Sequence, residues 1–263
     1  MSIELEKAGL DRSQKITKIA KMHSVFCKDS DSIAEVIDKI ITTGYRRLPV
    51  LSGNKMIGIV TYMNILDAFL RGQRFSEKIS TIMARDVIFC EAGDSIGYVL
   101  KKFKISRRGG FPIVENKKLV GMISERDFIK YFSDANFGMR IEELMTKKPF
   151  FVSSRISILD CLKSLVNSGY RRLPIVENRK LVGIVTGIDF LKYVKGKDLN
   201  TSNLKTPIDS LVIKDVFSIT KEKDVSDAIK IMKAKDIGGI PVIDNNNELE
   251  GIITERDILE EII

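Results

Sequence analysis

The sequence contains one histidine, three cysteines, six prolines and no tryptophan. A single histidine, His23, cannot supply a multi-histidine metal site. It is also the sole histidine that a catalytic triad could use. The cysteines at positions 27, 90 and 161 show no paired metal-ligand spacing, and their odd number favours reduced thiols packed in a core. We therefore expect no metal site and no catalytic cofactor, and we predict that the protein is not an enzyme.

Long apolar runs are also missing, and none could span a membrane. The opening residues MSIELEKAGLDRSQK are polar where a signal peptide needs an apolar stretch, which predicts a cytoplasmic protein that does not contact a membrane. Hydrophobic residues make up 44% and charged residues 30% of the 263 positions, as in ordinary globular proteins. A chain of this length can bury one large core or two of ordinary size.

The net charge of +8 favours anionic partners such as nucleotides, nucleic acid or an acidic protein surface. Charge alone does not choose among them, because lysines and arginines are mixed with acidic residues along the chain. Nucleic acid is the least favoured partner, since the sequence has no helix-turn-helix and no aromatic platform.

Four of the prolines stand in one recurring context. Each follows an apolar residue and precedes aliphatic residues, in LPVL, FPIV, LPIV and IPVI, at nearly constant spacing. A glycine follows each proline after nine or ten residues, and a hydroxyl residue comes three positions later. The prolines and hydroxyl residues are Pro49 with Thr61, Pro112 with Ser124, Pro174 with Thr186, and Pro241 with Thr254. The sequence is therefore a fourfold internal repeat.

The third repeat illustrates the predicted order of elements. A short apolar strand over 150–152 is followed by a helix that Ser157 caps and Gly169 ends. Two apolar runs flank the polar turn 177–180 as a hairpin, and Thr186 caps a final helix. The matching caps of the first helix in the other repeats are Ser32, Ser95 and Asp224. We predict an α/β fold of four β-α-β-β-α repeats.

Differences between the repeats predict how they are grouped. The first and third share GYRRLP, whereas the second and fourth share a diglycine before the proline and the triplet ERD. The apolar strands need cover on both faces, which a lone repeat of roughly 60 residues cannot provide. We expect a duplicated two-repeat module, as 1–138 and 139–263, with the boundary near FSDANFGMR. The repeats are expected at about 15–72, 78–136, 140–198 and 207–263.

These motifs closely resemble the cystathionine-β-synthase-domain (CBS-domain) family over about residues 15–263. The resemblance rests on the openings IMARDVI and LMTKKPF, the RRLPV-type strands, and GIVTYMN, GMISERD, GIVTGID and GIITERD. It implies pseudo-two-fold modules of two repeats, each with two clefts for an adenosine-containing ligand. Two modules would form a disc similar to the regulatory γ subunit of AMP-activated protein kinase. With no attached enzyme, any output domain would be another protein.

An aspartate follows three of the hydroxyl residues by three positions, as Asp127, Asp189 and Asp257. One carboxylate offers two acceptor oxygens to the two hydroxyls of a ribose, and the neighbouring helix N-terminus suits a phosphate. The same spacing is that of a capping box, so capping alone is the competing interpretation. The first repeat has Asn64 instead, which offers one acceptor oxygen, and we expect its site to be the weakest.

Arginines precede the strand proline in the odd repeats, as Arg46, Arg47, Arg171 and Arg172. A planar guanidinium suits phosphate, although surface salt bridges would also account for these residues. In the even repeats the arginine of ERD is a further phosphate candidate, with solvent exposure as the alternative. The diglycines suit either close approach of a ligand or a plain turn.

The predicted function is a regulatory sensor that binds AMP, ADP or ATP and acts on a partner protein, with a second copy of the chain as one candidate partner. The arginines favour these nucleotides over S-adenosylmethionine and methylthioadenosine, which have no phosphate. A scaffold without ligand and a binder of another adenosyl ligand such as S-adenosylmethionine remain as alternatives. The predicted nucleotide-binding residues are Arg46, Arg47, Pro49, Thr61, Asn64, Gly110, Pro112, Ser124, Arg126, Asp127, Thr146, Tyr170, Arg171, Arg172, Pro174, Thr186, Asp189, Gly239, Pro241, Thr254, Arg256 and Asp257.

Overall fold

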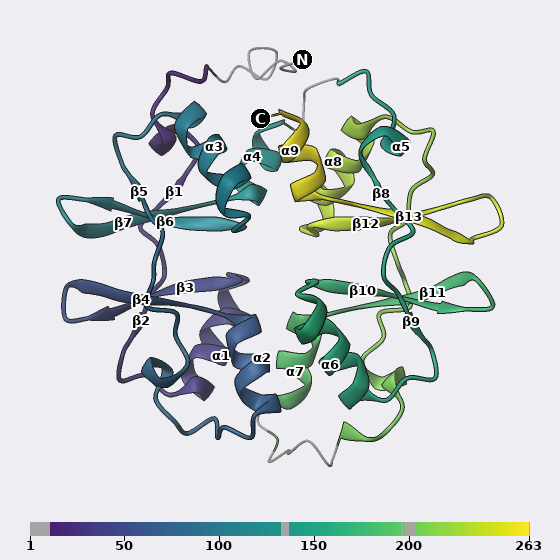
Figure 1. Ribbon diagram of the computed structural model, residues 1–263, viewed down its shortest axis with the longest axis horizontal. Coiled ribbons are helices and arrows are strands. Elements are labelled where there is room, and N and C mark those ends of the chain that lie inside the picture. Colours follow the sequence, from purple (N-terminus) through teal and green to yellow (C-terminus); the bar gives the residue numbers. More distant parts are fainter. Residues whose placement is uncertain (1–10, 133–136, 196, 198–203, 263) are drawn as a thin grey trace. The chain divides into compact units, whose positions relative to one another are not determined.

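The computed structural model describes residues 11–132, 137–195, 197 and 204–262. Repeats one to three have the predicted order of a short strand, a helix, a hairpin and a second helix, and repeat four has the same order with a single bridge in place of the short strand (Figure 1). The first repeat comprises β2 (Cys27–Lys28), α1 (Ile33–Thr43), β3 (Arg47–Ser52), β4 (Lys55–Thr61) and α2 (Tyr62–Leu70). The second comprises β5 (Cys90–Glu91), α3 (Ile96–Ser106), β6 (Gly110–Glu115), β7 (Lys118–Ser124) and α4 (Glu125–Tyr131).

The third repeat comprises β9 (Val152–Ser153), α6 (Ile158–Ser168), β10 (Arg172–Glu177), β11 (Lys180–Thr186) and α7 (Gly187–Val194). The fourth comprises α8 (Val225–Lys235), β12 (Gly239–Ile243), β13 (Leu249–Thr254) and α9 (Glu255–Ile262). A single parallel bridge of Ile219 with Val242 stands where the other repeats have their first strand.

A lead-in segment precedes each repeat. The elements of these segments are a 3₁₀ turn at Ile16–Lys18 with β1 (Lys21–Met22), a 3₁₀ turn at Ile79–Thr81, α5 (Ile141–Leu144) with β8 (Thr146–Lys147), and a 3₁₀ turn at Ile208–Ser210.

The first helix of each repeat starts at the predicted cap. The side chains of Ser32, Ser95, Ser157 and Asp224 each accept a hydrogen bond from a backbone N–H of the first turn. The odd repeats end this helix at a glycine with φ of 71°, as predicted for Gly169. The even repeats end it in the same left-handed conformation at Arg107 and Asp236.

The repeated proline lies in the first strand of each hairpin, which in repeats one to three also pairs with the first strand of the repeat and in repeat four with Ile219 through a single bridge. Pairing of β3 with β2 begins at Val50, one residue after Pro49. The missing N–H of the proline therefore removes no hydrogen bond to that strand. The other three prolines stand in the same place, one residue before Ile113, Ile175 and Val242.

The repeats form two compact units. The even unit consists of the described residues of 1–24, 88–149 and 217–263, and the odd unit consists of those of 25–87 and 150–216. In the even unit α4 lies beside α9, and in the odd unit α2 lies beside α7 (Figure 1). Each unit has its own apolar core. The division into modules 1–138 and 139–263 stays a prediction, and residues 133–136 of its boundary lie outside the described residues.

The lead-ins belong with a different repeat from the one they precede. Ile16 is fully buried in the core of the even unit, and β1 pairs with β7 of the second repeat. Ala84, ahead of the second repeat, bridges Ile59 of the first. In the same way β8 pairs with β13, and Ile213 bridges Ile184. Each lead-in therefore extends the sheet of another repeat of its own unit.

The glycine that follows each proline in the sequence gives the lead-in room to approach. A Cβ atom at Gly121 would lie 2.8 Å from the backbone oxygen of Lys21. At Gly251 it would lie 2.6 Å from Sδ of Met145, and at Gly58 it would lie 2.5 Å from Sδ of Met83. A larger residue at Gly121 would press on the lead-in backbone, and at Gly58 or Gly251 it would first displace a methionine side chain of the lead-in.

The cysteines are core residues, as predicted. Cys27, Cys90 and Cys161 are free thiols with no exposed surface, and burial raises the pKa of each to about 12. Among the described residues, no group of three or more histidine, cysteine or acidic side chains could hold a metal ion. In the same part of the chain, no helix combines the length and apolar character needed to cross a bilayer.

Candidate functional site

The hairpin register brings the predicted polar residues of each repeat to one strand end. The paired residues are Arg47 with Thr61, Gly110 with Ser124, Arg172 with Thr186, and Gly239 with Thr254. The first N–H of the following helix donates to the carbonyl beside this pair, as from Tyr62 to Arg46 at 3.3 Å. The four repeated prolines are buried in the same hairpins. In every repeat, backbone contacts thus hold three features together. They are the arginine or glycine that starts the hairpin, the hydroxyl residue that ends it, and the first turn of the second helix.

The aspartate of the second helix uses one carboxylate oxygen as a cap. Oδ2 of Asp189 accepts hydrogen bonds from the amide of Thr186 at 2.8 Å and from its hydroxyl at 2.7 Å. Asp127 and Asp257 make the same two contacts with their own cap residues. Within the described chain, Oδ1 of Asp127 and of Asp189 accepts no hydrogen bond. Capping therefore leaves one oxygen able to accept from a ligand.

The first repeat offers different chemistry at this place. Oδ1 of Asn64 accepts from the amide of Thr61 at 2.9 Å and from its hydroxyl at 2.8 Å. The cap is complete, but the remaining group of the side chain is Nδ2, which donates. Repeat one therefore presents a donor where the other repeats present a carboxylate oxygen.

The even-repeat aspartates lie in a less polar environment than a surface carboxylate. Burial raises the pKa of Asp127 and of Asp257 above the usual value for aspartate. The charge of Lys21 opposes this rise at Asp127. The hydroxyl of Thr146 donates to Oδ1 of Asp257 at 3.4 Å. Thr146 precedes the third repeat in sequence, yet the structure brings it to the predicted site of the fourth.

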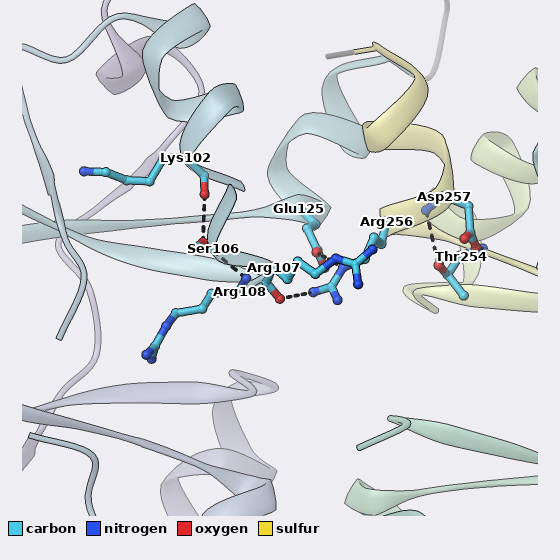
Figure 2. A network of polar contacts seen from close by, with 8 residues as sticks. All are labelled: Lys102, Ser106, Arg107, Arg108, Glu125, Thr254, Arg256 and Asp257. Carbon is cyan, nitrogen blue, oxygen red and sulfur yellow. Dashed lines mark hydrogen bonds and ion pairs between the residues drawn. The ribbon is translucent and has the colours of Figure 1, made fainter. Parts of the chain in front are cut away.

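The ERD arginines take part in two reciprocal ion pairs between α4 and α9. Nε of Arg256 lies 2.9 Å from Oε1 of Glu125 (Figure 2), and Nε of Arg126 lies 2.8 Å from Oε1 of Glu255. Glu125 and Glu255 are 3% and 2% exposed, so each arginine neutralises a buried charge. Nη1 of Arg126 also contacts Asp236 at 2.8 Å, whereas its Nη2 has no hydrogen-bond partner in the described structure.

In repeat four, the first glycine of the diglycine leaves room for the glutamate of ERD. A Cβ atom at Gly238 would lie 2.6 Å from the carboxyl carbon of Glu255. The second glycine is also confined, since a Cβ atom at Gly110 would lie 2.8 Å from the backbone oxygen of Ile123. Packing within the even unit thus confines Gly110 and Gly238, apart from the turn or ligand contact that the sequence predicts for the diglycines.

An aromatic pair stands beside the arginines of the third repeat. The rings of Phe150 and Tyr170 are stacked, with centroids 6.0 Å apart and an interplanar angle of 27°. They are 47% and 50% exposed. The sequence predicts Tyr170 as a site residue but not Phe150, because the apolar pattern predicts a strand over 150–152. The strand starts only at Val152, which leaves the Phe150 ring outside the sheet.

A family model described as CBS domain matches residues 16–71, 79–134, 141–196 and 208–263, which is well over half of the chain. The chain belongs to the CBS-domain family. Each of its four CBS domains is one repeat together with the lead-in ahead of it, so the predicted family and fold class are confirmed.

Among proteins similar to this CBS-domain protein, MJ1225 of Methanocaldococcus jannaschii is 29% identical over 95% of this chain and 98% of its own. The crystal structure of MJ1225, described as a proposed archaeal homolog of g-AMPK, has a TM-score of 0.88 at 28% identity, covering 95% of this chain and 100% of that chain. A protein of the ribosomal RNA operon of Thermofilum pendens is 26% identical over 87% of this chain and 85% of its own. A Pyrococcus horikoshii structure with a TM-score of 0.67 and 21% identity, covering 95% of this chain and 100% of that chain, shares the fold.

Proposed function

We propose that this CBS-domain protein is a regulatory sensor that binds adenine nucleotides and acts on a partner protein. The observation that carries the proposal is that the two carboxylate oxygens of each capping aspartate differ in their contacts. Oδ2 alone completes the cap in Asp127 and Asp189, so Oδ1 can accept from a ribose hydroxyl without disturbing the helix.

The surroundings of these aspartates suit the other two parts of a nucleotide. Arg172 starts the strand that pairs with Thr186, the cap partner of Asp189, and a guanidinium matches the geometry of phosphate oxygens. Arg47 stands at the same place in repeat one, where the cap partner is Asn64. The exposed rings of Phe150 and Tyr170 offer an apolar, flat surface of the kind on which an adenine stacks. The description of MJ1225 as a proposed g-AMPK homolog favours a regulatory role over catalysis.

The test is to identify small molecules released from the purified protein by mass spectrometry and to measure melting with added ligands. A ligand that binds only the folded state raises its stability by about 2.7 kcal/mol at a hundredfold excess over Kd. We expect AMP, ADP or ATP to raise the melting temperature more than adenosine does. A shift with S-adenosylmethionine alone would replace the nucleotide by another adenosyl ligand. No released ligand and no shift with any of these compounds would favour a scaffold.

A further inference from the structure

The even repeats have no side chain where the odd repeats carry arginines. Gly110 of repeat two pairs with Ser124, at the position that Arg47 and Arg172 occupy in the odd repeats. An arginine at position 110 would bring its Cβ atom to 2.8 Å from a backbone oxygen. A cation for a phosphate in repeat two must therefore come from another position.

The ERD arginines already serve buried glutamates. Arg126 is bound to Glu255 and Asp236, and Arg256 is bound to Glu125 and to the carbonyl of Arg107 at 2.8 Å. Turning either arginine toward a ligand would leave a glutamate buried without its partner, which is strongly unfavourable.

Arg108 is differently placed. Its amide donates to Oγ of Ser106 at 3.3 Å, and the preceding carbonyl, of Arg107, accepts the hydrogen bond from Arg256. The backbone is therefore held on both sides. Figure 2 shows the Arg108 side chain extending away from Glu125 and Arg256. The side chain is half-buried, and no acidic side chain of the described residues pairs with it.

We propose that Arg108 binds the phosphate of the nucleotide in repeat two, a role that rests on the proposed function. Arg108 lies two residues before Gly110, and Asp127 lies three residues after Ser124, so the Gly110–Ser124 pair brings both to one end of the hairpin. Asp127 would hold the ribose and Arg108 the phosphate.

Repeat four lacks this cation. Arg107 and Asp236 are matching left-handed helix ends, so Ile237 stands where repeat two has Arg108. The two even repeats share ERD and the diglycine, but this difference at one position gives them different ligand preferences. Repeat two favours a phosphorylated nucleoside, and repeat four gains no such contact.

The test uses full-length protein in which Arg46, Arg47, Arg171 and Arg172 are changed to Gln, so that the odd repeats no longer favour phosphate. Calorimetric titration of this background should still show tighter binding of AMP than of adenosine. Adding Arg108→Gln should lower AMP affinity by roughly ten- to a hundredfold, toward that of adenosine. Adding Arg107→Gln, the exposed neighbour, should leave the preference in place. Thermal melting checks that each variant is folded, and Arg108→Gln in the unmodified chain provides a second comparison if the background is unstable.

The outcomes separate the two proposals. A preference for AMP that survives Arg108→Gln, or a background with no preference while the unmodified chain has one, overturns the role of Arg108 and leaves the sensor function standing. An unmodified chain that binds no adenine nucleotide overturns the sensor function and this inference with it.

Discussion

Oδ2 of Asp189 accepts both hydrogen bonds from Thr186, so helix capping and ribose binding do not compete for the same oxygen. The two interpretations of the repeated spacing are therefore compatible within one side chain. Asn64 provides an internal comparison, since its amide oxygen makes the same cap but leaves a donor in place of the second acceptor. Asparagine can thus separate the two roles experimentally.

Changing Asp189→Asn should weaken nucleotide binding and leave folding almost intact. The amide oxygen can keep the cap, as it does in repeat one, whereas an acceptor worth about 1.5–3 kcal/mol to the ligand is lost. Changing Asp189→Ala should in addition lower the free energy of unfolding by about 0.5–2 kcal/mol, because the cap goes as well. Titration calorimetry and denaturant unfolding of both variants measure the two effects. If Asp189→Asn binds AMP as tightly as the parent, the carboxylate is a cap only.

Arg171 and Arg172 should discriminate nucleotide from nucleoside. A charge-assisted hydrogen bond is worth about 1.5–3 kcal/mol, so changing both residues to Gln should bring AMP affinity down toward that of adenosine. Adenosine binding should change little. Arg179, in the turn at the far end of the same hairpin, provides the control variant Arg179→Gln. A double variant that prefers AMP as strongly as the parent would place the phosphate elsewhere.

At the level of elements, the helix pairs of the two units are built from different side chains. In the even unit, α4 and α9 exchange Arg126–Glu255 and Arg256–Glu125 ion pairs. In the odd unit, α2 and α7 meet where Gly187 leaves room for the ring of Tyr62. The helices of the even unit are joined by ion pairs, and those of the odd unit pack an aromatic ring against a glycine. This difference favours the pairing of even with even and odd with odd repeats.

Changing Arg126→Met should lower the free energy of unfolding by about 3–5 kcal/mol, because it leaves Glu255 charged and buried without a partner. Changing Glu255→Met in the same chain should recover most of the loss. Arg71→Met removes an exposed ion pair with Asp67 and should cost only about 0.3–0.5 kcal/mol. Denaturant unfolding measures all three, and a double variant as unstable as the single one would show that the buried charge is not the cause.

The repeats, their helix caps and their hairpins could be predicted because each depends on neighbours in the sequence. Ser157 caps the helix that begins next to it, and Gly169 ends that helix through its own φ. The reasons for Gly121 and Gly238 lie in distant partners, Lys21 and Glu255, which no local pattern reveals. The residue types of the candidate site could be predicted because the hydroxyl residue and the aspartate stand at a fixed local spacing. The buried ion pair of Arg126 with Glu255 could not, because it joins residues more than a hundred positions apart.

At the level of the whole chain, the boundaries of the family repeats differ from those of the compact units. The first CBS match begins at residue 16, yet Ile16 is buried in the core of the even unit, whereas residues 25–71 of the same match belong to the odd unit. Ile79, the matching residue of the second repeat, is buried in the odd unit. A sequence repeat here combines the lead-in of one unit with the body of the other.

Changing Ile16→Ala should therefore loosen the even unit, although position 16 is part of the first CBS match. A fully buried isoleucine costs about 2–5 kcal/mol when cut to alanine. Native-state hydrogen exchange should speed up in β6, β7 and β12 and stay nearly unchanged in β3 and β4. Ile79→Ala is the matched control and should give the opposite distribution. Faster exchange in β3 for the Ile16 variant would contradict the assignment of this lead-in.

The interleaving of the two units also sets an order of events on the ribosome. All residues of the odd unit precede position 217, so they leave the ribosome before the last segment of the even unit does. The even unit waits for residues 217–263, and until they emerge the helix α4 keeps Glu125 and Arg126 without the partners that α9 supplies. The apolar residues of repeat two that share a core with repeat four gain those partners only when this last segment is present.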